Sequence, residues 1–308
     1  MEELHISVLL KEAIEELKLR DNSIIVDATL GYGGHSSNIL DRIKKGFLFA
    51  FDQDSEAINY STNRLKPIGA NFTIIKNNFV NLKKELNDRK IDKVDGILFD
   101  LGVSSPELDE DYRGFSYHKD AYLDMRMDQE AKLTAHDVVN KYDINKLTDI
   151  FRRYGEDKFA RNIAKKIVEA REIKEIDTTL ELVEIIKTAV PMKFRIAKHP
   201  ARQIFQAIRI EVNHELDVLE PALKDALSML SVGGRLIVIT FHSLEDRIVK
   251  HLFKEVSKIP DIVKGMPNIP EEYLPDYKEI ASISPTKEEI EKNPRARSAR
   301  MRVIERIK

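Results

Sequence analysis

Residues 24–36 read IIVDATLGYGGHS, an apolar run that ends at Asp27 and opens into a glycine-rich loop. A short apolar run followed by turn residues and a helical pattern is typical of a strand buried in a parallel sheet. Similar apolar runs recur at 47–52, 72–75 and 94–100. The chain is therefore predicted to be an α/β protein with an open, Rossmann-like parallel sheet.

A fifth apolar run, 235–241, follows only after about 130 residues, a gap too long for one crossover connection. Within the gap, 151–171 and 179–190 have helical periodicity, and we interpret this segment as an inserted helical domain. A long helix that begins near Pro200 is expected to lead the chain back to the sheet. The length of 308 residues also favours one large domain and one smaller domain.

The composition is that of a globular protein, with 42% hydrophobic and 33% charged residues. The chain has no cysteine, which excludes disulfides, thiolate metal sites and thiol nucleophiles. Residues 1–20 have an acidic amphipathic pattern without the basic start and long apolar core of a signal peptide. No apolar run approaches the roughly 20 residues that cross a bilayer. We therefore expect a cytoplasmic protein with no membrane partner.

The net charge of −2 conceals two strongly basic segments, 186–210 and 292–308. Their basic residues are Lys187, Lys193, Arg195, Lys198, Arg202 and Arg209 in the first, and Lys292, Arg295, Arg297, Arg300, Arg302, Arg306 and Lys308 in the second. One such cluster alone is usually solvated surface. Two clusters favour a surface that binds nucleic-acid phosphates.

Ligands of open parallel sheets bind at the carboxyl ends of the strands, so the residues that end the apolar runs are candidates for a binding site. The glycines after Asp27 let the backbone approach a ligand closely, and N–H groups at a helix start attract a carboxylate or phosphate. Asp52 ends the second run, where it can accept hydrogen bonds from both ribose hydroxyls of an adenosine.

A dinucleotide cofactor is the main alternative ligand, and the glycine spacing argues against it. The pattern G-x-G-x-x-G from Gly31 would require glycine where the chain has Ser36, and there is no P-loop sequence. Two acids beside the loop suit an ammonium group and an adenosine, whereas they would repel a pyrophosphate. We expect S-adenosylmethionine rather than NAD, with Asn77, Asn78 and Phe79 enclosing its adenine.

Eight sequence blocks, spread from residue 5 to residue 300, resemble those of a known family. They are HISVLL (5–10), DATLGYGGH (27–35), DLGVSSPELD (100–109), YRGFS (112–116), LDMRMD (123–128), FQAIRI (205–210), FHSLEDR (241–247) and NPRARSAR (293–300). Their order and spacing resemble the RsmH (MraW) family, which methylates the N4 amine of a cytidine in the ribosomal decoding centre.

The resemblance implies a class I methyltransferase sheet that binds S-adenosylmethionine, formed by 1–106 and 199–308, with 107–198 as a helical RNA-recognition insert. It also implies a set of cofactor-binding residues. These are Gly33, Gly34 and His35 at the methionine end, Asp52 at the ribose, Phe79 near the adenine, then Asp100 and Glu107. The family commonly has glutamine at position 107, and a carboxylate there accepts but cannot donate a hydrogen bond.

Asp100 is the candidate catalytic residue. The N4 amine of cytosine shares its lone pair with the ring, so it attacks a methyl group well only if its N–H groups meet acceptors. Positioned proton acceptance typically contributes about 10²–10⁴-fold. We expect the 100–106 loop to replace the D-P-P-Y loop of other amino-methylating enzymes. A role for Asp100 in cofactor binding alone is left open.

Two other side-chain groups need an interpretation. His242, Glu245 and Asp246 are interpreted as a helix start that can also line a substrate cleft, and neither a catalytic triad nor a metal site is expected. The second group is either an ion-pair network between the domains or a set of RNA contacts. It consists of Arg113, Asp124, Arg126 and Asp128.

The expected partner is 16S ribosomal RNA within the assembled small subunit, whose target base would have to be unstacked into the pocket. A homodimer is left open. The alternative function is a ribosome-assembly factor that binds RNA and cofactor without turnover.

Overall fold

The computed structural model describes residues 7–103, 111–195 and 199–308, so Glu107 and Lys198 lie outside the described residues. Contacts divide the chain into two compact units. The first is formed by Met1–Gly102 with Leu216–Lys308, and the second by Val103–Glu215.

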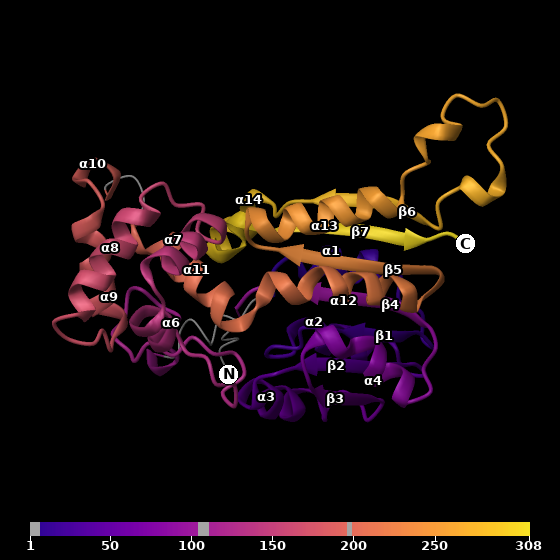
Figure 1. Ribbon diagram of the computed structural model, residues 1–308. Helices are drawn as coiled ribbons and strands as arrows, with labels where there is room; N and C mark the ends of the chain where they lie inside the picture. Colours follow the sequence, from indigo (N-terminus) through magenta and orange to yellow (C-terminus); the bar gives the residue numbers. More distant parts are fainter. Residues whose placement is uncertain (1–6, 104–110, 196–198) are drawn as a thin grey trace. The chain divides into compact units, whose positions relative to one another are not determined.

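The first unit contains a seven-stranded sheet in the order β3-β2-β1-β4-β5-β7-β6 (Figure 1). The strands are β1 (Ile24–Asp27), β2 (Phe47–Asp52), β3 (Phe72–Lys76), β4 (Val94–Asp100), β5 (Leu230–Thr240), β6 (Tyr277–Ile283) and β7 (Arg300–Arg306). Strands β1 to β5 are parallel, and β7 is antiparallel to both of its neighbours. The predicted α/β, Rossmann-like sheet is confirmed.

Strands β6 and β7 were not predicted from the sequence. In β7, Met301, Val303 and Ile304 are buried, and so is Arg302 between them. The arginines of this segment indicated a basic surface and obscured the apolar positions of a strand. The interpretation of the tail as a phosphate-binding surface is therefore wrong for Arg302, whereas Arg300 of the same strand is exposed.

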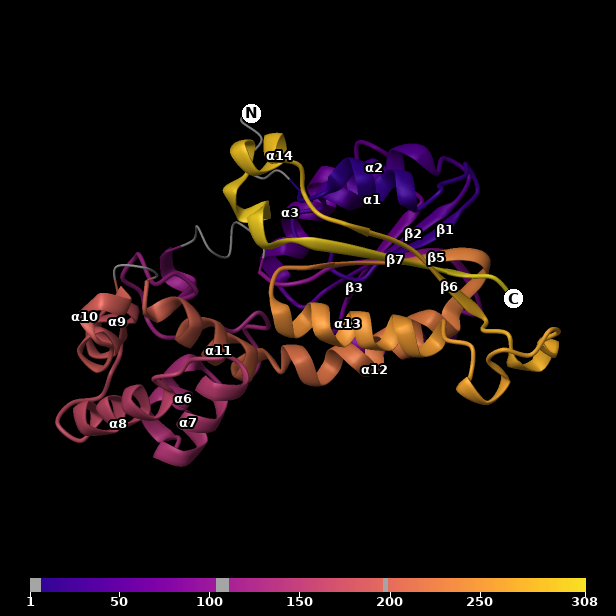
Figure 2. The same cartoon turned by 90° about the horizontal axis from the view of Figure 1, so that it is seen from above.

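Helices of the first unit lie on both sides of the sheet. They are α1 (Leu10–Glu16), α2 (Gly34–Arg42), α3 (Ser55–Leu65), α4 (Leu82–Asp88), α12 (Glu215–Met229), α13 (Ser243–Val256) and α14 (Lys287–Lys292). Figure 2 shows α1 and α2 on one face of the sheet and α12 and α13 on the other. Short 3-10 turns complete the unit at η1 (Phe79–Asn81), η3 (Asp261–Val263), η4 (Glu271–Tyr273) and η5 (Pro294–Ser298).

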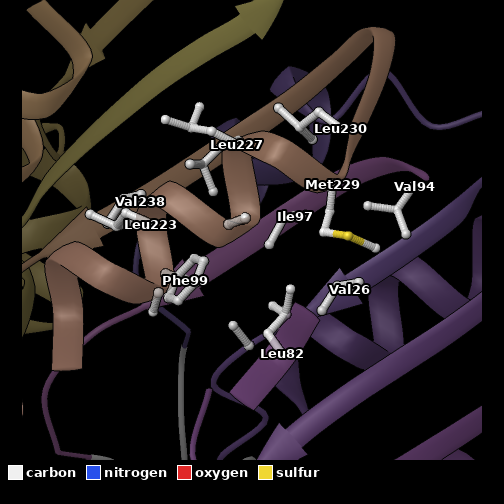
Figure 3. Close-up of a cluster of buried hydrophobic side chains, with 14 of the residues drawn as sticks. Val26, Leu82, Val94, Ile97, Phe99, Leu223, Leu227, Met229, Leu230 and Val238 are labelled. Atoms are coloured by element: carbon white, nitrogen blue, oxygen red, sulfur yellow. The ribbon is translucent and has the colours of Figure 1, made fainter. Parts of the chain in front are cut away.

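The strands are apolar on both faces because each face is covered. Successive side chains of a strand point to opposite faces, and accordingly Ile25 and Val26 belong to different core clusters. Figure 3 shows the cluster of Val26, in which Leu223 and Leu227 of α12 join Ile97 of β4. Full burial of one such side chain contributes about 1.5–3 kcal/mol. The strand ends that carry the candidate site are thus held on a well-packed layer.

The second unit is helical. Its elements are η2 (Asp111–Arg113), α6 (Ala135–Lys141), α7 (Ile144–Arg153), α8 (Ala160–Arg171), α9 (Thr179–Ala189), α10 (Met192–Arg195) and α11 (Ala201–Asn213). Capping boxes begin α6 at Thr134 and α9 at Thr178. The predicted insert, 107–198, lies within this unit, which also includes α11.

The long helix expected to return to the sheet is two helices. In α11, Ile204, Ala207 and Ile208 are fully buried, and this helix contacts α6, α7 and α9 of its own unit. The chain turns at His214, which has a left-handed φ of 53°, and only the next helix, α12, packs on the sheet. The apolar face of α11 was predicted correctly, but its partner was not.

Among the described helices, none is both long and apolar enough to cross a membrane.

Candidate functional site

Three aspartates end neighbouring strands at one edge of the sheet. Asp27 ends β1, Asp52 ends β2 and Asp100 ends β4. The strand order places β1 between β2 and β4, so the chain diverges to both sides from this point. In open α/β sheets such a switch point is where ligands bind. The structure therefore brings together the predicted aspartates.

The glycine loop between β1 and α2 requires glycine at particular positions. Gly31 and Gly33 have positive φ angles of 49° and 74°, which side chains rarely adopt. A Cβ atom at Gly34 would lie 1.9 Å from the Oγ of Ser7. The Ser61 hydroxyl donates to the Gly31 carbonyl at 2.7 Å and fixes the loop from α3. The loop is thus a closely packed backbone cradle at the start of α2.

Asp27 holds this loop in place. Its carboxylate accepts a hydrogen bond from the Ser36 hydroxyl at 2.6 Å and one from the Thr29 amide at 3.2 Å. Burial raises the pKa of Asp27 to about 6, although the bond from Ser36 opposes this shift. Each oxygen of Asp27 thus has one partner within the loop and the helix that follows it, and the expected role of this carboxylate beside a ligand's ammonium group stays a prediction. Ser36, noted only as a missing glycine, is one of these partners.

Asp52 faces the same loop from β2. Its Oδ2 accepts from the Gly31 amide at 2.8 Å and its Oδ1 from the Asp54 amide at 2.9 Å. Burial raises the pKa of Asp52 to about 6, against the lowering effect of these amides. A carboxylate has about four acceptor positions, so Asp52 can still accept hydrogen bonds from a ligand's hydroxyls.

Asp100 lies close to His35, the second residue of α2. The Oδ2 of Asp100 is 3.5 Å from the Nδ1 of His35, and its amide donates to the Thr29 hydroxyl at 2.6 Å. Its Oδ1 is buried and has no hydrogen-bond partner among the described residues. Burial raises the pKa of Asp100 well above its usual value, and the charges of Asp27 and Glu245 raise it further. This carboxyl group therefore favours a bound proton or a nearby cation.

Phe79 begins the 3-10 turn after β3. Its ring lies edge-on to Phe99 of β4, with 5.4 Å between the ring centroids. The neighbouring amides have local partners: Asn77 Nδ2 donates to Glu85 at 2.8 Å and Asn78 Nδ2 to Gln53 at 3.0 Å. These bonds hold both amide side chains in place, and their expected contact with an adenine stays a prediction.

His242 caps α13. Its Nδ1 accepts from the Glu245 amide at 3.4 Å, and the Glu245 carboxylate accepts from the His242 amide at 3.3 Å. These two bonds form a capping box. The helix start was predicted, but the cap is His242 and not Ser243. Asp246 pairs instead with Arg302 of β7, at 2.7 and 2.9 Å.

Arg126 and Asp124 form a bidentate ion pair within the second unit, at 2.8 and 2.7 Å. Although burial alone would raise it, the pKa of Asp124 is lowered by the hydrogen bonds and charge of Arg126. Arg113 donates to the Arg126 carbonyl at 2.9 Å, and Asp128 accepts from the Glu130 amide at 2.9 Å. The described contacts of this group hold a loop of the second unit together.

Within the second unit, a histidine cluster has the composition of a metal site. The ligand atoms of His136, Glu175 and Asp177 lie within 4.8 Å of one another in the second unit. The His136 Nε2 is 3.2 Å from the Asp177 Oδ1. A hydrogen bond between these two side chains accounts for the arrangement without an ion.

Several of the predicted basic residues have intramolecular partners. Lys187 pairs with Glu184 at 2.7 Å, and Arg195 donates to the Val190 carbonyl at 2.7 Å. The Arg209 guanidinium binds Glu215 through two bonds of 2.8 Å. Charge counting along the sequence cannot distinguish these residues from those available to an external anion.

The chain is similar to known proteins along its whole length. The model of the MraW methylase family matches residues 2–307. A ribosomal RNA small subunit methyltransferase H of Exiguobacterium sibiricum is 51% identical over 99% of this chain and 98% of its own. A protein of the same name from Streptococcus dysgalactiae subsp. equisimilis is 52% identical, with the same coverage. The crystal structure of an rRNA methylase from Streptococcus thermophilus superposes with a TM-score of 0.44, at 13% identity, and covers 97% of this chain and 94% of that one.

Proposed function

Because the chain belongs to the MraW methylase family, we propose that it methylates small-subunit ribosomal RNA at the N4 amine of a cytidine in the decoding centre. The methyl donor is S-adenosylmethionine, and the seven-stranded sheet is that of a class I methyltransferase. The observation that carries the proposal is the identity of about half of all residues with two ribosomal RNA small subunit methyltransferases, over nearly the whole chain.

The cofactor is proposed to bind at the carboxyl ends of β1, β2 and β4. Two features of the structure fit this ligand. The first is the cradle at Gly34, where Ser7 leaves no space for a side chain. The second is the buried Oδ1 of Asp100, which has no partner among the described residues and suits a cationic ligand.

Each predicted cofactor residue has a proposed role. Gly33, Gly34 and His35 hold the methionine end, and Asp52 accepts from the ribose hydroxyls. Phe79 packs beside the adenine, supported by Phe99. The Asp100 carboxylate lies near the reacting methyl group of the cofactor. Glu107, outside the described residues, is retained as a proposed contact.

S-adenosylmethionine supplies an electrophilic methyl group on a positively charged sulfur. The task of the protein is to place the amine in line with that group and to accept its proton. Asp100 is the proposed acceptor, because it is the buried carboxyl of this edge with an oxygen that the described residues leave unbonded. Its raised pKa makes it a stronger base than an exposed aspartate, and positive charge nearby favours its ionised form.

The helical unit is proposed to recognise the RNA around the target base. A base within folded RNA must be unstacked before it can enter a pocket, so the surrounding phosphates have to be held. The assembled small subunit in the cytoplasm is the proposed substrate. A non-catalytic assembly factor is the alternative function.

The test is to incubate under-methylated small subunits, or naked ribosomal RNA, with the protein and S-adenosylmethionine. Nucleosides from the RNA are then analysed by mass spectrometry. New N4-methylcytidine supports the proposal, and its appearance only with subunits indicates recognition of the assembled particle. A methyl group on another atom contradicts the N4 assignment. No methylation of either substrate, with cofactor bound, supports the assembly factor.

A further inference from the structure

Two lysines of the helical unit are held against a single aromatic ring. The Nζ of Lys158, two residues before α8, lies 3.6 Å from the centroid of the Phe194 ring. The Nζ of Lys193 lies 5.1 Å from the same centroid. The first of these distances is short for a cation–π contact and the second is within its range. One ring in α10 thus gathers positive charge from two separate segments.

The segments that carry these lysines are fixed by packing and hydrogen bonds. The rings of Phe159 and Phe194 are tilted against each other, with 5.1 Å between their centroids. The Asn162 side chain in the first turn of α8 donates to the Ala189 carbonyl at the end of α9. The Arg195 Nε donates to the Val190 carbonyl at 2.7 Å. The lysine positions therefore follow from the fold of the unit.

Neither lysine is neutralised by an ion pair with the described residues, in contrast to exposed lysines elsewhere in the unit. Lys141 pairs with Asp137 at 2.6 Å, and Lys174 pairs with Glu181 at 2.6 Å. Asp157, the acid next to Lys158, is buried and accepts from the Phe159 amide at 2.6 Å. The two ammonium groups beside one ring repel each other, so a nearby anion would make the arrangement more favourable.

The surrounding sequence adds positive charge. Arg161 is exposed in the first turn of α8, where the helix dipole opposes a cation. Its charge is therefore not explained by the stability of the helix. Arg152 is exposed in the last turn of α7, and 191–202 contains no acidic residue.

We propose that Lys158 and Lys193, presented by Phe194, bind backbone phosphates of the small-subunit ribosomal RNA, an inference that rests on the proposed function. The ammonium groups act as point charges for phosphates, so this surface positions the RNA without reading its bases.

The experiment measures binding of the full chain to small ribosomal subunits over a series of salt concentrations. The variant Lys158→Gln/Lys193→Gln removes the two charges. Its matched control is Lys141→Gln/Lys174→Gln, which removes the same net charge from the same unit at lysines that already have carboxylate partners. The logarithm of the binding constant decreases with the logarithm of the salt concentration, and for the first variant the steepness of this slope is expected to be smaller by about 1.5 to 2. It is expected to stay within error for the control.

The Phe194→Leu variant keeps both charges and removes the ring. It is expected to weaken binding to subunits while the salt slope is retained, because the lysines are no longer held. Unchanged binding by Phe194→Leu overturns the role of the ring. Unchanged affinity and slope for Lys158→Gln/Lys193→Gln, or an equal loss in the control, overturns the phosphate surface.

Methylation of the same subunits separates this inference from the function on which it rests. If the wild-type protein forms N4-methylcytidine but the lysine variant binds normally, only the surface is wrong. If the wild-type protein binds subunits with the expected lysine dependence but methylates nothing, the surface holds and the proposed catalytic function fails. Absence of binding by the wild-type protein overturns both.

Discussion

The Oδ2 of Asp100 lies 3.5 Å from the Nδ1 of His35, which links the end of β4 to the first turn of α2. The other carboxylate oxygen of Asp100 is buried without a described partner. One oxygen is thus oriented by the protein and the other is left for a ligand. A proton acceptor requires one oriented oxygen and one free oxygen, and a substitution that preserves the shape of the Asp100 side chain can test this role.

The Asp100→Asn variant is expected to lower the single-turnover rate by about 10²–10⁴-fold, because an amide of the same shape cannot take a proton from the amine. Cofactor affinity, measured by calorimetry on the same variant, should change much less. An unchanged rate would exclude the catalytic role. A rate that falls only in proportion to a lost cofactor affinity would assign Asp100 to cofactor binding alone.

Asp27 is expected to make the stability of the protein depend on pH. Its pKa is about 6 in the folded chain and near 3.8 in an exposed aspartate, so the folded state binds the proton more tightly. The contribution is present at low pH and is lost as the pH rises from about 4 to about 6. The shift of about 2 pKa units corresponds to roughly 3 kcal/mol.

The matching variant is Asp27→Asn, in which the side-chain carbonyl can still accept from Ser36. Urea unfolding of both proteins at pH 4.5 and pH 7.5 gives the difference between their free energies of unfolding. The wild-type protein is expected to lose stability relative to Asp27→Asn at the higher pH. The opposite sign would show that Asp27 is stabilised as a carboxylate, with a lowered pKa.

Gly34 offers a test of the backbone cradle. A Cβ atom there would lie 1.9 Å from the Oγ and 3.2 Å from the Cβ of Ser7. Gly34→Ala is expected to cost about 1–3 kcal/mol in stability or cofactor binding, as overpacking usually does. Gly34→Ala/Ser7→Ala removes the clashing oxygen and should recover part of the loss. Equal losses in the single and double variants would show that Ser7 is not the limiting contact.

The parts of the fold predicted from the sequence are those with local signals. The five parallel strands are continuous apolar runs, and Asp52 and Asp100 were found because a strand end is visible in the sequence as an acid after such a run. The glycine loop was found for the same reason. By contrast, the partners of Asp27 come from the loop that follows it and from the first turn of α2, and no spacing rule indicated that Ser36 would bond back to the strand.

The parts that were missed depend on tertiary contacts. The apolar stripe of α11 indicates that the helix is buried, but it does not indicate which unit the helix packs against. The arginines of β7 look in the sequence like those of a nucleic-acid surface. Only the contact of an arginine with its partner in the structure shows that its side chain is buried. Lys158 was missed because the ring that it contacts, Phe194, belongs to a different segment of the chain.

Arg302 tests that distinction between internal and external arginines. It is 8% exposed and binds Asp246 of α13 through two hydrogen bonds, which join the antiparallel strand to a helix that covers the sheet. Removing one partner of such a pair leaves the other charge poorly solvated. Arg302→Gln is therefore expected to lower the free energy of unfolding by about 1–3 kcal/mol.

Asp246→Asn should destabilise the protein by a similar amount, and the double variant by clearly less than the sum, because the two residues stabilise the fold through each other. Chemical denaturation of the three variants measures this coupling. Binding of Arg302→Gln to small ribosomal subunits should keep the wild-type salt slope under conditions where the variant is folded. Additive losses of stability would show that the two residues act independently, and a slope reduced by about 1 would make Arg302 a contact to phosphate.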